Sequence, residues 1–257
     1  MIFGKYITMY EQLFTLSFAI MLIVVYFSGI IRGYTGFGSA LLTVPALAIL
    51  FGPVQAVAIE ILIEIPVSIG LLPTAYKNFE KKTVFPILIA FLIFVPLGTF
   101  LLILIDPNIV KVIISLFVLF SVYLLSKQSK IKSLASVKAN YVIGALSGLT
   151  QGLTGMAGPL FATAILAKGD NSLITRANIV MLSAAIIGLS VISFLTFGLI
   201  SNQTIIYAVL ASPAILLGAW TGTILFNKYS NKNFKSIMLM VLILAALVTL
   251  FDSQYFY

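Results

Sequence analysis

The 257-residue sequence contains no cysteine and no histidine. The lack of cysteine excludes a disulfide framework, thiol chemistry and cysteine-ligated iron–sulfur clusters, and it leaves the redox compartment undetermined. The lack of histidine removes the imidazole proton relay and the usual zinc and haem ligands. The sequence also has no Walker loop, HExxH helix or GxSxG elbow. We therefore expect no enzyme active site, no metal and no cofactor.

Charged residues are scarce as well. They make up 9% of the chain against 61% hydrophobic residues, and the mean hydropathy is +1.17. A water-soluble domain cannot have this composition without burying nearly every side chain. Apolar runs of about 20 residues, long enough for a bilayer core of roughly 30 Å, recur along the whole chain. The sequence thus predicts one all-α, polytopic domain over residues 1–257, in the cell membrane.

Apolar segments follow one another along the chain. They are predicted at residues 13–31, 36–52, 55–73, 84–105, 109–126, 141–155, 157–167, 174–197, 204–226 and 236–251. The first is too long for a signal-peptide core and has no small-residue cleavage site after it, so we interpret it as retained. The polar stretch 127–140 is the longest interruption. It predicts a linker between repeat 1, residues 13–126, and repeat 2, residues 141–251.

A motif of the first half returns in the second. The decapeptide SGIIRGYTGF begins at Ser28, and SGLTQGLTGM begins at Ser147, 119 positions later. Five of the ten positions are identical. A match at one offset near half the chain length indicates an internal duplication.

Basic residues indicate how the repeats are oriented. If each glycine motif returns the chain to its starting side, as two crossings or as a re-entrant hairpin, 12 basic residues share one face and only Lys5 and Lys111 lie opposite. If each motif crosses once, giving eight spans, the split is 8 to 6. The positive-inside rule favours the first arrangement. It places both termini outside and the linker in the cytoplasm, and an odd number of segments per half makes the repeats inverted.

Glycine and threonine cluster where each half would break its helix, in GYTGFGS and GLTGMAGP. Non-helical backbone at membrane depth is tolerated only where protein or a water-filled cavity satisfies it. In transporters built from inverted repeats that cavity is the substrate site, with half-helix N-termini aimed at anionic groups. We expect close backbone approach at Gly36, Gly38, Gly155 and Gly158, and a new helix beginning at Pro159.

Ordinary helix packing is the alternative reading of these glycines. Small residues four apart bring transmembrane helices together without any ligand. The pairs Gly29 with Gly33 and Gly148 with Gly152 have this spacing.

Arg32 is the only cation within either motif, and Gln151 holds the equivalent position in the second copy. An arginine near the bilayer centre costs roughly 3 kcal/mol on insertion scales, so it needs a partner or a ligand. The alternative is that the side chain snorkels to the cytoplasmic interface. A ligand at this position would be an anion, and only the first repeat would supply a positive charge to it.

Glu60 and Glu64 are the only acids inside an apolar segment. Their four-residue spacing stacks them on one helix face with Ser68. Two stacked carboxylates cannot both ionise cheaply in a medium of low dielectric constant, which predicts a proton-coupling role. The alternative is that one of them neutralises Arg32 or Arg176, and Arg176 itself reads as an interfacial anchor. Pro66 lacks the amide that would bond back along the helix, so we expect a kink near these acids.

At these motifs the chain resembles the TauE/SafE family of sulfite and organosulfonate exporters. The resemblance covers residues 14 to 251 and includes GYTGFGSALLTVPALAILFGP, YKNFEKK, GLTQGLTGMAGPLFATAILAKG and TRANIVML. Many members carry a denser glycine run than the GFGS and GMAGP found here. The resemblance implies substrate-binding positions at Gly33, Thr35, Gly36, Phe37, Gly38 and Ser39 and at Gly152, Thr154, Gly155, Met156, Gly158 and Pro159.

The family resemblance also implies the function. We expect a secondary transporter that moves a small sulfur-containing anion between the two motif breaks, with proton coupling through the acid pair and no nucleotide hydrolysis. A passive anion channel and a membrane scaffold subunit are the alternatives. The expected partners are the anion and the lipid bilayer, without nucleic acid, and a homo-oligomer is left open.

Overall fold

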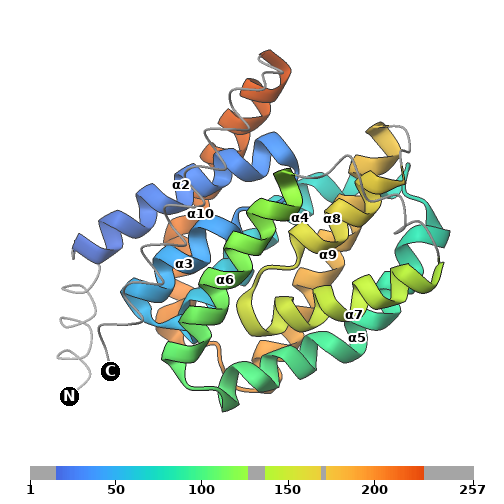
Figure 1. Ribbon diagram of the computed structural model, residues 1–257. Helices are drawn as coiled ribbons and strands as arrows, with labels where there is room; N and C mark the ends of the chain where they lie inside the picture. The colour runs from blue at the N-terminus through green and yellow to red at the C-terminus, as the bar shows by residue number, and fades with distance from the viewer. Residues whose placement is uncertain (1–15, 127–136, 169–171, 229–257) are drawn as a thin grey trace.

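The computed structural model describes residues 16–126, 137–168 and 172–228, and this part of the chain folds into helices without a strand (Figure 1). The helices are α2 (Leu16–Thr35), α3 (Ala40–Phe51), α4 (Pro53–Tyr76), α5 (Lys81–Leu104), α6 (Pro107–Ser126), α7 (Val137–Thr154), α8 (Gly158–Ala167), α9 (Ser172–Thr196) and α10 (Asn202–Lys228). The all-α prediction is confirmed.

The predicted apolar segments correspond to these helices, except that segment 236–251 lies outside the described residues. Most of the predicted linker, residues 127–136, also lies outside them. The linker boundary at residue 140 was placed too late, because α7 already begins at Val137. Asn140 is polar in sequence but 2% exposed, so it packs inside the protein as part of the helix. Helix α4 continues through Pro66 as one element.

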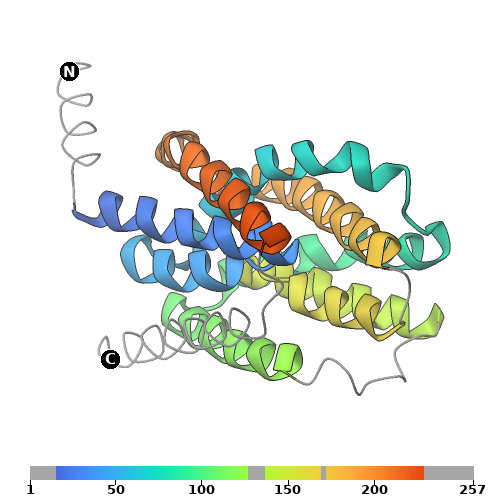
Figure 2. The ribbon, with the colours of Figure 1, turned by 90° about the horizontal axis from the view of Figure 1, so that it is seen from above.

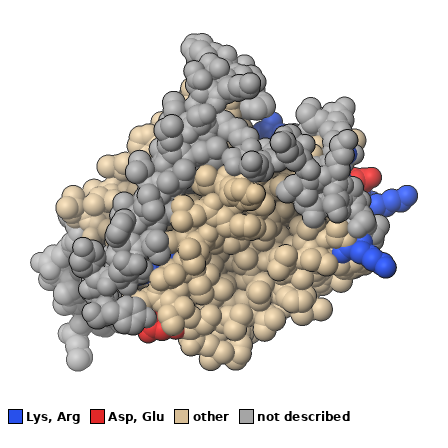
Figure 3. Space-filling view, viewed as in Figure 1, with Lys and Arg blue, Asp and Glu red and all other residues tan. Residues whose placement is uncertain are grey.

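Within the described residues, six helices are long and apolar enough to cross a membrane: α2, α4, α5, α6, α9 and α10. Much of the described surface in Figure 3 is correspondingly free of charge, with lysine, arginine and acidic side chains near its ends. The chain is a multi-pass membrane protein. Helices α3 and α8, with 12 and 10 residues, are too short to cross alone.

Two breaks interrupt the helices at the glycine motifs. Helix α2 ends at Thr35 and α3 begins at Ala40, whereas α7 ends at Thr154 and α8 begins at Gly158. The breaks contain glycines with positive φ, 83° at Gly36, 93° at Gly38 and 71° at Gly155, which other residues rarely adopt. After the first break, α3 returns alongside α2 in both ribbon views (Figures 1 and 2).

Helices of the two halves pack against each other in pairs. Helix α2 of the first half contacts α10 of the second, and α7 of the second half contacts α5 of the first. Added methyl groups at Gly33 and Gly152 would meet the backbone of Ala219 and of Val95, respectively. The helix-packing reading is therefore confirmed for these two glycines, since only glycine lets the two backbones approach so closely.

Helices α4 and α9 form the centre of the bundle. They contact each other, and α4 also contacts α10 while α9 contacts α5. Buried residues make up 56% of the α4 span and 50% of the α9 span, the highest shares among the six long helices. Polar side chains on these two helices, among them Glu60, Glu64, Asn178 and Ser183, are buried within the protein.

Candidate functional site

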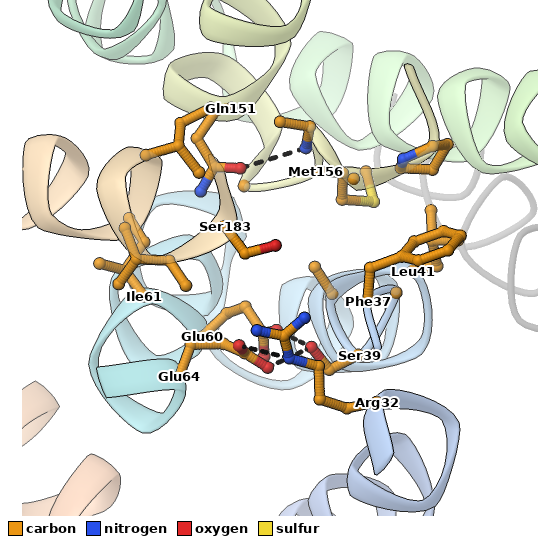
Figure 4. A pocket seen from close by; sticks show the side chains of 18 of the residues that line it. Arg32, Phe37, Ser39, Leu41, Glu60, Ile61, Glu64, Gln151, Met156 and Ser183 are labelled. Carbon is orange, nitrogen blue, oxygen red and sulfur yellow. Dashed lines mark hydrogen bonds and ion pairs between the residues drawn. The ribbon is translucent and has the colours of Figure 1, made fainter. Parts of the chain in front are cut away.

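A cavity of about 50 Å³ lies where the two helix breaks meet the middle of α4 and α9 (Figure 4). The breaks touch at its edge, because a methyl group at Gly158 would lie 3.1 Å from the Phe37 ring. Polar and charged side chains of four helices and one break line the space: Arg32, Ser39, Glu60, Glu64, Gln151 and Ser183. The cavity can hold a few water molecules or one small anion.

Arg32 occupies the last turn of α2 and is 2% exposed. This burial excludes the reading in which the side chain snorkels to the interface. Its Nη1 donates a hydrogen bond to the carbonyl oxygen of Gly36, which the break leaves without a helical partner. Its Nε lies 3.0 Å from Glu64 Oε2. Nη2 is buried and has no hydrogen-bond partner among the described residues, so the guanidinium reaches the cavity with a donor unused (Figure 4).

Ser39 joins the two acids. Its Oγ lies 2.9 Å from Glu60 Oε1 and 2.5 Å from Glu64 Oε1. One hydroxyl proton can serve only one of these contacts at a time. Glu64 also lies against the Arg32 guanidinium, so the arginine, the serine and the two acids form one buried cluster.

The second half contributes neutral groups at matching positions. Gln151 follows Arg32 by 119 positions, and Ser183 follows Glu64 by the same 119. Both side chains line the cavity. Gln151 Oε1 accepts a hydrogen bond of 3.1 Å from the amide of Ala157, within the second break. Ser183 was missed from the sequence, although the repeat offset applied to Glu64 would have found it.

The two breaks are built alike. The amide of Gly36 donates to the carbonyl of Arg32 at 2.8 Å, and the amide of Gly155 donates to that of Gln151 at 2.8 Å. The hydroxyls of Thr35 and Thr154 each donate to the carbonyl four residues earlier, at 2.8 and 2.7 Å. The threonines thus complete the last helical turn before each break, and they do not line the cavity.

The predicted site residues fall into two groups. Those that line the central cavity are Arg32, Phe37, Gly38, Ser39, Glu60, Glu64, Gln151, Gly155, Met156, Gly158 and Pro159. Those that do not line it are Gly33, Thr35, Gly36, Gly152 and Thr154. The second group shapes the helix ends and helix contacts that hold the first group in place.

Comparison with protein families gives a match over residues 18–249 to the model described as Sulfite exporter TauE/SafE. Comparison with curated proteins and with solved structures gives no match.

Proposed function

Because the chain belongs to the sulfite exporter TauE/SafE family, we propose that it is a secondary transporter that carries a small sulfur-containing anion through the central cavity. The observation that supports this most directly is the unused guanidinium donor of Arg32, buried in a cavity between two helix breaks. A planar guanidinium can bind two oxyanion oxygens at once. Sulfite, a sulfonate or a related oxyanion are the candidate substrates, and the small volume favours the smallest of them.

The second half supplies uncharged donors. The Nε2 amide of Gln151 and the hydroxyl of Ser183 can each donate to an anion held by Arg32. The substrate-binding residues we propose are therefore Arg32, Ser39, Gln151 and Ser183 together with the backbone of the two breaks. Glycine at Gly38 and Gly155 lets that backbone approach the ligand.

Proton coupling follows from the charge of the cavity. An anion that binds Arg32 competes with Glu64 for the same guanidinium, and the displaced carboxylate would be a buried charge without a counter-ion. Protonation of Glu64 removes that charge. We therefore propose that Glu64, with Glu60 as its neighbour in the hydrogen-bonded pair, takes up one proton when a singly charged anion enters.

We also propose that the two halves are inverted repeats with a cytoplasmic linker and both termini outside. The reciprocal packing of α2 with α10 and of α7 with α5 supports this arrangement. So does the return of α3 alongside α2, which brings the chain back toward its starting side (Figure 2). Each glycine motif would then form a hairpin rather than a single crossing.

A flux assay in liposomes tests the function. The purified protein should release sulfite faster than empty liposomes, and a pH gradient should drive accumulation against the sulfite gradient. Transport that follows the anion gradient alone, with no response to pH, would instead identify a passive anion channel. An absence of flux for sulfite, sulfonates and carboxylates in protein that stays folded would contradict the proposal and leave the scaffold alternative.

A further inference from the structure

Two more cavities lie beyond the central one. One of about 250 Å³ lies between α2, α4, α9 and α10, and another of about 500 Å³ lies where α4 ends and α9 begins. These two share Gly70, Leu71 and Arg176. The 250 Å³ cavity shares Arg32, and no other residue, with the lining of the central cavity. The three spaces therefore form a series with an arginine at each junction.

The outer two cavities are lined by charge of one sign. Their described lining includes Arg32, Lys77 and Arg176 but no aspartate or glutamate. Arg176 is exposed, and within the described part of the chain it forms no ion pair or hydrogen bond. A cleft lined by one sign of charge raises the local concentration of counter-ions. These two outer cavities therefore attract anions and repel cations.

We propose that Arg176 and Lys77 form an outer recruitment site for the transported anion, from which it passes along the cavity series to Arg32. This inference rests on the proposed function, since it takes the cargo to be an anion. It gives Arg176 a role beyond that of an interfacial anchor. It also means that in this conformation the central cavity is approached from the face where α4 ends and α9 begins, which the topology proposal assigns to the cytoplasm.

Gly70 provides a probe position on this route. It lines both outer cavities, and a methyl group placed there would have no atom within 4 Å. Gly70→Cys therefore introduces a thiol without a steric clash into a chain that has no other cysteine. Two membrane-impermeant methanethiosulfonates serve as reagents, the anionic ethylsulfonate and the cationic ethyltrimethylammonium, each compared with its rate on a free thiol.

We expect the Gly70→Cys thiol to react in inside-out vesicles. Its ratio of reaction rates, anionic over cationic reagent, should exceed the same ratio for a free thiol. Adding Arg176→Gln should reduce that preference about 3 to 10-fold at low salt, and the effect should shrink as the Debye length falls. Arg176→Lys should keep the preference. Lys81→Gln is the matched control, because this basic residue lines neither cavity. An unreactive thiol, or a preference unchanged by Arg176→Gln, would overturn the proposal.

A transport measurement separates this inference from the proposed function. Arg176→Gln should raise the KM for sulfite added on the recruiting side several-fold, with kcat nearly unchanged, and high salt should abolish the difference. Labelling needs no transport, so a charge-selective thiol in a protein without flux would contradict the transport function only. Flux with unchanged labelling selectivity and KM in Arg176→Gln would contradict the recruitment site only.

Discussion

An anion that enters the central cavity meets an arginine that already has a counter-ion. Arg32 Nε is 3.0 Å from Glu64 Oε2, and both side chains are buried. Removing one partner of a buried pair leaves an uncompensated charge, which typically costs about 3–5 kcal/mol. Variants at Arg32 or Glu64 therefore change stability and binding together, and their tests need a charge-matched control.

Arg32→Gln should nearly abolish anion binding, and Arg32→Lys should weaken it because an ammonium lacks the bidentate fork. A lost charged hydrogen bond is worth about 1.5–3 kcal/mol, or roughly 10 to 150-fold in affinity, measurable by scintillation proximity or calorimetry. The double variant Arg32→Gln with Glu64→Gln removes both charges and should fold like the parent but still not bind. Sulfite binding at parental affinity in the double variant would show that Arg32 is structural only.

Glu64→Gln should have the opposite effect on binding. It removes the competitor for Arg32 while leaving an unpaired cation, so sulfite should raise the apparent Tm of this variant more than that of the parent. Accumulation driven by a pH gradient should be lost, whereas anion exchange should continue. Glu60→Gln should fold normally, because the amide oxygen can accept the same hydrogen bond from Ser39. Full gradient-driven accumulation in both single variants would rule out coupling through these acids.

At the scale of helices, close backbone contact between α2 and α10 and between α5 and α7 depends on glycine. A methyl group at Gly33 would lie 2.7 Å from the carbonyl carbon of Ala219, and one at Gly152 would lie 2.7 Å from that of Gly98. Neither neighbour can turn aside, since both are backbone atoms within a helix.

Gly33→Ala and Gly152→Ala should therefore destabilise the protein by about 1–3 kcal/mol through overpacking. At about 2–4 °C per kcal/mol, the fall in apparent Tm is measurable in detergent. Gly188→Ala is the control, because this helical glycine has no atom within 4 Å of the added methyl group. It should be neutral or slightly stabilising. Equal effects at all three positions would contradict the packing argument.

The helices and the two breaks could be predicted, because the length of an apolar segment and its glycine content determine the local backbone structure. The contacts of Arg32 were not, since periodicity places Glu60 and Glu64 on one face of a helix but does not say which other helix that face meets. Ser39 is a similar case. Its sequence position suggested an anion ligand, and only the fold shows that its hydroxyl bridges the two acids. The roles of Thr35 and Thr154 could not be predicted, because a threonine hydroxyl can donate a hydrogen bond either to a ligand or to a carbonyl oxygen of its own helix.

At the scale of the whole molecule, the open question is the topology: two inverted repeats with a hairpin at each glycine motif, or eight spans with a single crossing at each motif. The two topologies differ at one testable pair of loops, which contain the exposed residues Asn78 and Asn202. Single-cysteine variants Asn78→Cys, Asp106→Cys and Asn202→Cys can be labelled with an impermeant maleimide in whole cells. If the repeats are inverted, residues 106 and 202 should label from outside and residue 78 only after permeabilisation. Labelling of residue 202 together with residue 78 would restore the eight-span arrangement.

The reciprocal helix packing has a consequence for biogenesis. Thr223 Oγ1 lies 3.5 Å from the carbonyl oxygen of Gly33, and these residues are 190 positions apart. At about 5–20 residues per second, a ribosome takes roughly 10–40 s to make that distance. Until then α2 lies in the membrane without its partner helix. It exposes a glycine surface and the charge of Arg32, both of which are covered in the folded protein. A membrane insertase or chaperone that shields α2 during this interval would raise the yield of assembled protein, and chains arrested before α10 would be natural substrates for a membrane protease.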